Sequence, residues 1–273
     1  MAHQVNPKKQ PGSEKFFLCL QEMFDGWAKE DPPKMKKLSV EVDVPELLAK
    51  LALVIGATEL TKAIGDNCMI AFYYLLRIGG YTVKVTRNNS KHTVRFKLED
   101  VTFFINNALG KLRQLPWSAS NDEIMTAEGA TLKLDNQKNG WKGLCVHQEH
   151  NGDIHYCAIR ALRHRYFHIR WPTSSQKILL LAYYVDGIRY DVTDQDIRDS
   201  IKWAAKELNY PATKGIPINI IDTHSLCSGG ANALALDGYL NTQIQKWGDG
   251  EGQLPRSIFA RNLHATPREC PVT

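Results

Sequence analysis

Residues 222–248 read Asp-Thr-His-Ser-Leu-Cys-Ser-Gly-Gly-Ala-Asn-Ala-Leu-Ala-Leu-Asp-Gly-Tyr-Leu-Asn-Thr-Gln-Ile-Gln-Lys-Trp-Gly, and this stretch decides the fold. It predicts a helix that begins among small residues near His224, continues as an apolar segment and is followed by a turn and a short amphipathic helix. Glycine is a poor helix former, so a pair inside a helix indicates packing against a close neighbour. We therefore expect this helix to pack through Gly229 and Gly230.

Composition places the chain among ordinary globular proteins. Of its 273 residues, 43% are hydrophobic and 23% charged, and the net charge of +5 permits a polyanionic partner without requiring one. The longest apolar runs, 68–76 and 178–185, are too short to cross a bilayer, so we expect no membrane span. The six cysteines include no CxxC pair and indicate reduced thiols in an intracellular protein.

Residue periodicity predicts helices together with one small antiparallel sheet. Helices are expected at residues 16–29, 58–78, 157–171 and 193–208, with Gly79-Gly80 ending the second and Thr193 capping the last. Strand-like segments are expected at 82–85, 94–98, 101–105, 132–134, 144–147 and 179–184, with turns at Asn139-Gly140 and Asp186-Gly187. This order of elements predicts an α+β fold.

A second informative stretch is Leu75-Leu76-Arg77-Ile78-Gly79-Gly80-Tyr81, which places an arginine at the end of a buried helix. Taken alone, Arg77 is explained as a surface charge that the negative end of the helix dipole favours. The block from His224 to Gly230, which reads His-Ser-Leu-Cys-Ser-Gly-Gly, changes that interpretation.

Together the two stretches resemble the tyrosine recombinases of the phage-integrase superfamily, and in particular their eukaryotic mobile-element type. The resemblance covers residues 33–248 and implies a mostly helical α+β catalytic domain with a small antiparallel sheet. It implies that residues 1–32 are a disordered lead-in plus the last helix of a truncated DNA-clamping domain. Residues 249–273 are then an aberrant C-terminal tail.

The family breaks and rejoins DNA through a tyrosine nucleophile, with no metal or cofactor, so the resemblance implies a site for a DNA phosphate. It assigns Arg77 as a phosphate-binding arginine and His224 as a general base or phosphate ligand. It assigns Lys138 as the catalytic lysine, with Lys142 of the same hairpin as the alternative. An arginine suits such a site because its planar fork donates two parallel hydrogen bonds to phosphate oxygens.

Three positions depart from the family pattern. Cys227 stands where the second arginine is usual, Gly250 where a tryptophan or histidine is usual, and Ile258 where the nucleophilic tyrosine is usual. Loss of one charge-stabilising donor typically lowers the rate by about a hundredfold or more. Without the tyrosine no cleavage is available, so we expect a catalytically inactive copy that binds duplex DNA.

The tail suggests how the ending was lost. Codons for Trp247 to Ile258 can be chosen so that the adjacent reading frame gives Gly-Arg-Trp-Arg-Gly-Ala-Thr-Ser-Lys-Glu-Tyr, which resembles the missing family ending. This pattern supports a single-base slip in a decaying mobile-element gene. A non-functional product of a transposable element is therefore one alternative, and a non-catalytic DNA-binding remnant is another.

Basic residues outside the catalytic set are candidates for contacts with DNA phosphates. Those expected to face the duplex are Arg87, Lys91, Lys97, Lys142, Arg160, Arg163, His164 and Arg165. The partner is then double-stranded DNA, and the location is nuclear if the source is a eukaryote. Relatives assemble as oligomers on DNA by exchanging C-terminal helices, and the altered tail argues against that exchange here.

One alternative from another class is a zinc site. Zinc-ligating residue types gather at Cys145, His147, His150, His155 and Cys157. Their spacing matches no standard zinc finger, and a hairpin with exposed histidines explains the pattern more simply.

Overall fold

The computed structural model describes residues 38–83, 94–106, 111–134, 144–153, 155–170, 175–240 and 244. The chain divides into two units, Met1–Lys36 and Lys37–Thr273, and all described residues belong to the second. The expected helix at 16–29, the Asn139-Gly140 turn and the tail at 249–273 lie outside the described residues.

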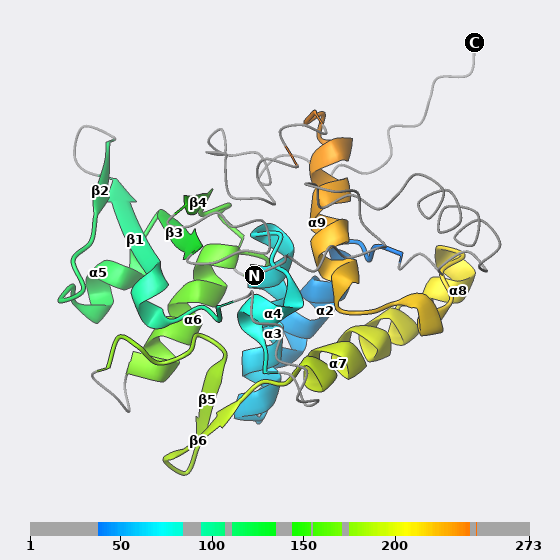
Figure 1. Cartoon of the computed structure of the whole chain (residues 1–273), viewed down its shortest axis with the longest axis horizontal. Helices are drawn as coiled ribbons and strands as arrows, with labels where there is room; N and C mark the ends of the chain where they lie inside the picture. Colours follow the sequence, from blue (N-terminus) through cyan, green and yellow to red (C-terminus); the bar gives the residue numbers. More distant parts are fainter. Residues whose placement is uncertain are drawn as a thin grey trace, which may run out of the picture. The chain divides into compact units, whose positions relative to one another are not determined.

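Within the second unit, a small antiparallel sheet lies on one side together with some of the helices, and the other helices lie on the opposite side (Figure 1). The helices are α2 (Asp43–Ala52), α3 (Glu59–Tyr73), α4 (Ile78–Tyr81), α5 (Asn121–Met125), α6 (Ala158–Arg170), α7 (Asp194–Glu207), α8 (Tyr210–Thr213) and α9 (His224–Leu236), with 3-10 turns η1 (Leu98–Asp100) and η2 (Ile218–Ile220). The strands are β1 (Val101–Asn106), β2 (Leu112–Gln114), β3 (Gly129–Leu134), β4 (Leu144–Glu149), β5 (Ala182–Val185) and β6 (Ile188–Asp191). The predicted α+β class is confirmed.

The larger sheet has the strand order β2-β1-β3-β4, with every neighbouring pair antiparallel. Val101 and Phe103 of β1, Leu132 of β3 and Val146 of β4 are all buried, so one face of the sheet packs on the core. The predicted hairpin between residues 132–134 and 144–147 is confirmed, because Leu132 pairs with Val146 and Lys133 with Cys145.

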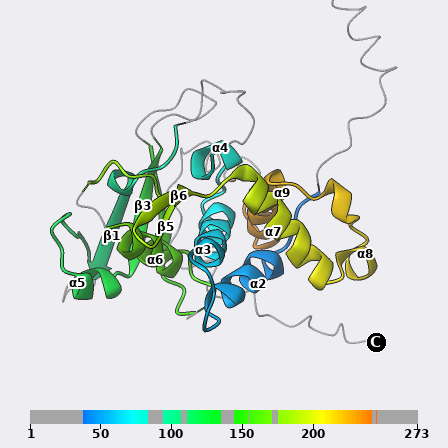
Figure 2. The same cartoon turned by 90° about the horizontal axis from the view of Figure 1, so that it is seen from below.

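Helix α3 is the centre of the core and lies between α6 on one side and α2, α7 and α9 on the other (Figure 2). Thr58 caps its start by accepting a hydrogen bond from the Thr61 N–H at 3.1 Å. Every residue from 63 to 73 is buried. A helix that is apolar on most of its surface needs partners on several sides, and the surrounding helices supply them.

The expected end of this helix at Gly79-Gly80 is wrong. Helix α3 stops at Tyr73, and Leu75 adopts a left-handed conformation with φ of 52°. The Leu76 N–H donates to the Ala71 carbonyl at 2.9 Å, which is the hydrogen bond of a Schellman helix end. Leucine tolerates this backbone because the side chains of Leu75 and Leu76 are both buried in the core. The two glycines instead lie in α4.

The second sheet contains the predicted turn at Asp186-Gly187. Strands β5 and β6 form a two-residue hairpin in which Asp186 and Gly187 both have positive φ, at 51° and 77°. Such a turn matches the twist of antiparallel strands, so the Asp186-Gly187 turn is confirmed. The expected strand at 94–98 is wrong, since this segment makes only an isolated bridge from Lys97 to Leu179.

Helix α7 begins directly after Thr193, as predicted from the preference of threonine for the N-cap position. The Thr193 hydroxyl accepts from the Asp196 N–H at 3.1 Å, while the Asp196 carboxylate accepts from the Thr193 N–H at 2.8 Å. This reciprocal capping box satisfies two backbone donors that the helix itself leaves unpaired. Among the described helices, none has the length and apolar content that a bilayer crossing requires.

Helix α9 approaches its neighbours backbone to backbone. A Cβ atom at Gly229 would collide with the Val40 carbonyl, and one at Gly230 would collide with the Phe72 carbonyl of α3. The Val40 N–H also donates to the Ser225 carbonyl at 3.1 Å, which holds the start of α9 to the same segment. The prediction that α9 packs through its glycine pair is confirmed.

We expect Gly230→Ala to destabilise the protein by about 2 kcal/mol, because overpacking against a carbonyl outweighs the better helix propensity of alanine. The measurement is urea denaturation followed by circular dichroism. Leu236→Ala is the control, since this side chain lies on the same helix and is 90% exposed; it should change stability by less than about 0.5 kcal/mol. Equal stabilities of the two variants would contradict the close packing.

Candidate functional site

The two stretches that decided the sequence interpretation meet at one point. The Cys227 thiol of α9 donates a hydrogen bond to the Leu75 carbonyl at 3.1 Å, although the residues are 152 positions apart. Arg77 follows two residues after Leu75 and is half-buried. Burial raises the pKa of the Cys227 thiol, and the positive charge of Arg77 opposes that shift.

The helix end at Leu75 explains where Arg77 lies. The left-handed residue turns the chain sharply, and Leu76 is then buried, with 4% of its surface exposed. Arg77 has an extended backbone, with φ of −77° and ψ of 142°, and directly precedes α4. Its backbone therefore lies in the short connection between α3 and α4.

His224 is the first residue of α9, and it is exposed. The turn before it is tightly bonded: the Asp222 N–H donates to the Ser225 hydroxyl at 3.0 Å, and the Thr223 N–H donates to the Asp222 carboxylate at 2.7 Å. His224 and Cys227 are three residues apart, which places them on neighbouring positions of one helix face. The start of a helix also offers backbone N–H groups and a positive dipole to an anion.

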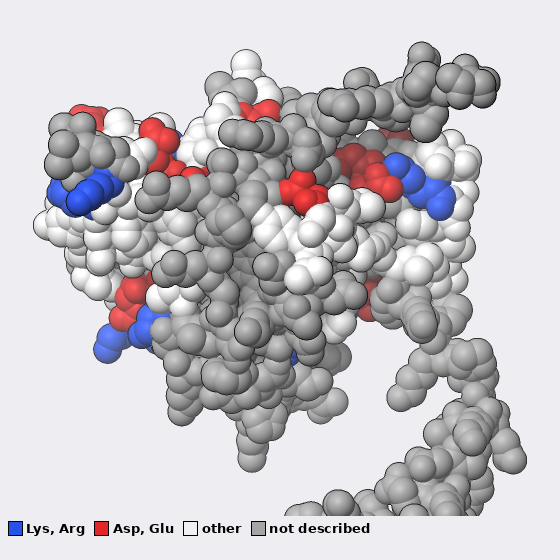
Figure 3. Space-filling view, turned by 90° about the horizontal axis from the view of Figure 1, so that it is seen from above, with Lys and Arg blue, Asp and Glu red and all other residues white. Residues whose placement is uncertain are grey.

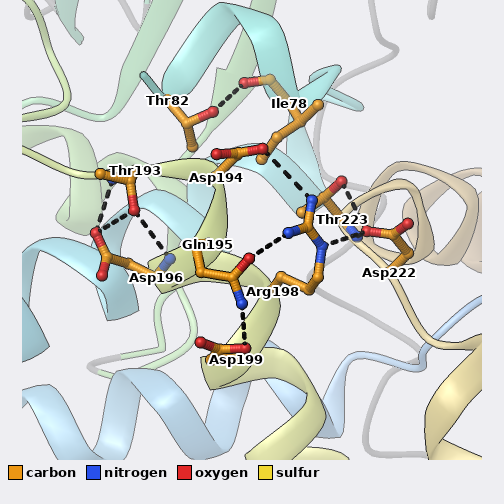
Figure 4. Close-up of polar contacts among 10 residues, drawn as sticks. All are labelled: Ile78, Thr82, Thr193, Asp194, Gln195, Asp196, Arg198, Asp199, Asp222 and Thr223. Atoms are coloured by element: carbon orange, nitrogen blue, oxygen red, sulfur yellow. Dashed lines mark hydrogen bonds and ion pairs between the residues drawn. The ribbon is translucent and has the colours of Figure 1, made fainter. Parts of the chain in front are cut away.

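Arg198 of α7 joins this turn to α7, and the sequence interpretation missed it (Figure 4). Its guanidinium donates to Asp222 at 3.1 Å, to Asp194 at 3.4 Å and to Gln195 at 2.6 Å. The spacing of four residues from Asp194 to Arg198 suits a helical ion pair and was a visible signal. The contact with Asp222, 24 residues further along the chain, had none.

The beginning of α7 also holds the segment that follows α4. The Val83 N–H donates to the Val192 carbonyl at 3.0 Å, and the Asp194 N–H donates to the Val83 carbonyl at 2.9 Å. The Thr82 hydroxyl, in turn, donates to the Ile78 carbonyl of α4 at 2.7 Å (Figure 4). The first turn of α7 therefore connects the segment that contains Arg77 with the segment that contains His224.

Several predicted site residues lie outside the part of the chain that the structure describes. They are Arg87, Lys91, Lys138, Lys142, Gly250 and Ile258. Of the predicted catalytic set, Arg77, His224 and Cys227 are described, and the structure brings the Cys227 thiol to the Leu75 carbonyl, two residues before Arg77.

Arg163 and Arg165 are expected from the sequence to contact DNA, but both side chains are buried within the protein. Arg163 donates to the carbonyls of Met125 and Ala127, both at 2.6 Å, and only 9% of its surface is exposed. Arg165 is 1% exposed and donates to the carbonyls of Leu180 and Ala182. Both guanidiniums donate hydrogen bonds to carbonyl groups inside the protein.

Arg165 is a buried cation at the centre of the packing between α6 and β5. Burial lowers its pKa to about 10, while the nearby carboxylates of Asp66 and Glu59 oppose that shift. A buried charge needs such partners because transfer out of water is otherwise very unfavourable. Its role is therefore to hold α6, α3 and β5 together.

Other basic side chains contribute little to a continuous surface. Arg160 and His164 contact each other at 3.3 Å, and Lys97 pairs with Glu99 at 3.0 Å. On the face shown in Figure 3, the described Lys and Arg side chains lie in separate groups beside acidic ones. No continuous basic stripe is visible there among the residues that are described.

The zinc alternative is wrong for the residues that the structure describes, among which no group of three or more His, Cys, Asp or Glu side chains could hold a metal ion. The ring of His147 packs edge-on against Phe104, with centroids 5.4 Å apart. Of the five suggested ligands, His150 and Cys157 hydrogen-bond to each other. Burial would raise the pKa of Cys157, but this bond and backbone N–H groups lower it overall.

Comparison with models of known protein families finds none that matches the chain, and comparison with curated proteins finds no match.

We expect Arg165→Ala to destabilise the protein by about 3 kcal/mol or more, because it leaves two carbonyls without donors and Asp66 without its buried counter-charge. Arg160→Ala is the control on the same helix, and its half-buried side chain should contribute less than about 1 kcal/mol. Thermal or urea unfolding measures both. If Arg165→Ala kept full stability and lost only DNA affinity, the buried placement of Arg165 would be incorrect.

His168 of α6 links the same elements through its neutral form. Its Nε2 atom accepts from the Tyr184 N–H of β5 at 3.0 Å, and its Nδ1 atom lies 3.2 Å from a Glu59 oxygen. Burial, followed by the charge of Arg165, lowers the pKa of His168, and Glu59 opposes this. An imidazolium could not accept the Tyr184 hydrogen bond.

Stability should therefore depend on the titration of His168. A lowered pKa means that the folded state favours the neutral ring, so this contribution is complete above the ordinary pKa of about 6.5. It is lost as the pH falls through the lower pKa of the folded protein. We expect the free energy of unfolding to fall as the pH decreases below about 6.5, measured by urea titration, and His168→Gln to flatten that part of the curve. A variant with the same slope as the parent would assign the effect to another group.

Proposed function

We propose that this chain binds double-stranded DNA through a partial phosphate site at Arg77 and the start of α9, as a catalytically inactive relative of the tyrosine recombinases. The observation that carries the proposal is the hydrogen bond from Cys227 to the Leu75 carbonyl. It joins the two stretches that resemble the active-site motifs of that family.

The chemistry of the site suits binding better than catalysis. Arg77 supplies a fixed positive charge and a bidentate donor, while the beginning of α9 supplies His224 and a positive dipole. Cys227 adds no positive charge, and burial keeps its thiol protonated by raising its pKa. A single arginine can hold a phosphate oxygen, but it cannot offset the charge that spreads over the phosphate in a transition state.

Strand cleavage also needs a nucleophile. The family pattern places that tyrosine at residue 258, where this chain has isoleucine. The proposed activity is therefore DNA binding without strand breaking and rejoining, inside the cell and in the nucleus of a eukaryotic source. The altered tail makes binding as a single copy the simpler expectation.

The experiment is fluorescence anisotropy with a labelled duplex, repeated over a range of salt concentrations. We expect Arg77→Gln to weaken binding about tenfold and to reduce the salt slope by about 1, the signature of one lost phosphate contact. Arg189→Gln is the matched control. It removes the same charge from β6, where Arg189 pairs with Asp191 at 2.9 Å, and the β5–β6 hairpin lies away from α9 in Figures 1 and 2.

Two outcomes would overturn the proposal. Absence of binding even at low salt would exclude DNA as the partner. Equal losses of DNA affinity in Arg77→Gln and Arg189→Gln would show that Arg77 is not part of a specific phosphate site. A covalent adduct with nicked DNA would contradict the inactivity, since it requires a nucleophile that the pattern does not supply.

A further inference from the structure

The side chain of Arg198 contacts acceptors both within α7 and in the turn before α9. The guanidinium reaches three acceptors, and two of them, Asp194 and Asp222, are carboxylates of different elements. Gln195 is itself fixed, because its amide nitrogen donates to Asp199 at 2.7 Å. With its N–H groups engaged on these partners, Arg198 is held in place and is not a spare cation for a ligand (Figure 4).

The most informative of these partners is Asp222. One oxygen of its carboxylate, Oδ1, accepts both from Arg198 and from the Thr223 N–H. Asp222 stands two residues before His224, and its own N–H donates to Ser225. Arg198 therefore holds in place the turn that directly precedes α9 and His224.

Asp222 would otherwise work against an anion at this place. A carboxylate beside the start of α9 puts a negative charge where the helix would attract a phosphate, and like charges at such range repel. Arg198 pairs with this carboxylate, and the Asp222 side chain is only 27% exposed, so solvent screens it less than a surface charge.

We infer that Arg198 is a positioning residue for the phosphate site: it fixes the Asp222–His224 turn and neutralises Asp222, so that the start of α9 can accept an anion. This inference rests on the proposed function. Arg198 also pairs with Asp194, whose N–H is bonded to Val83 beyond α4. One side chain thus links the segments that carry His224 and Arg77.

The test uses the full chain with Arg198→Gln and Arg189→Gln as a matched pair. Both substitutions remove one positive charge that is paired with an aspartate, and only the first lies in the network of Figure 4. We expect Arg198→Gln to weaken affinity for the labelled duplex about five- to tenfold, and Arg189→Gln to change it less than about twofold. Equal effects of the two variants would overturn the inference.

Hydrogen exchange separates this inference from the proposed function. We expect the amides of residues 223–225 to exchange about tenfold faster in Arg198→Gln than in the parent, with no change there in Arg189→Gln. If the parent protein binds no DNA, the proposed function and the phosphate role of Arg198 are both wrong. If the amides of residues 223–225 exchange as slowly in Arg198→Gln as in the parent, only the claim that Arg198 fixes the turn is wrong.

The double variant Arg198→Gln/Asp222→Asn separates orientation from charge. Asparagine keeps an oxygen for the Thr223 N–H but removes the carboxylate charge. Return of most of the lost affinity would support neutralisation of Asp222 as the larger effect, and no return would support orientation of the turn. Restoration of both parental affinity and parental exchange rates in the double variant would show that Arg198 does not position the turn.

Discussion

The approach of α9 to the carbonyls of Val40 and Phe72 is the constraint on which the rest of the structure depends. Because Gly229 and Gly230 have no Cβ, the helix lies against two backbone segments at once. That depth brings Cys227 to the Leu75 carbonyl and therefore brings the start of α9 to Arg77. A larger side chain at either glycine would lift the helix and separate the two halves of the site, so the packing of the core and the geometry of the site are one requirement.

Some of the charged side chains of this protein are buried. Arg163 and Arg165 are buried and serve backbone carbonyls that loops and strand ends leave without partners. Arg198 likewise serves the turn before α9. The guanidiniums of Arg163 and Arg165 therefore contribute nothing to a basic surface, although burial of Asp66 and Asp100 leaves the net charge of the described surface unchanged. An arginine that serves several carbonyl or carboxylate groups stabilises irregular segments where hydrogen bonds between backbone groups are not available.

Local signals predicted the elements whose causes are local. Thr193 marked the start of α7, the Asp186-Gly187 pair marked a hairpin, and the glycine pair marked the packing of α9. The end of α3 was missed because leucine rarely adopts the left-handed conformation, and only burial of Leu75 makes it favourable here. The buried arginines and the Arg198–Asp222 pair were missed for another reason. Their partners come from segments far away in the sequence, and a helical pattern of basic residues does not reveal which carbonyls it will meet.

Cys227 has a consequence for how folding and occupancy are related. An arginine in its place would set a second guanidinium beside Arg77, and two cations at close range repel each other unless an anion lies between them. In an empty pocket of that kind the two guanidiniums repel each other, and a bound anion offsets the repulsion. With a neutral thiol bonded to the Leu75 carbonyl, the junction of α3 and α9 carries no such tension. The junction therefore needs no anion to separate two cations.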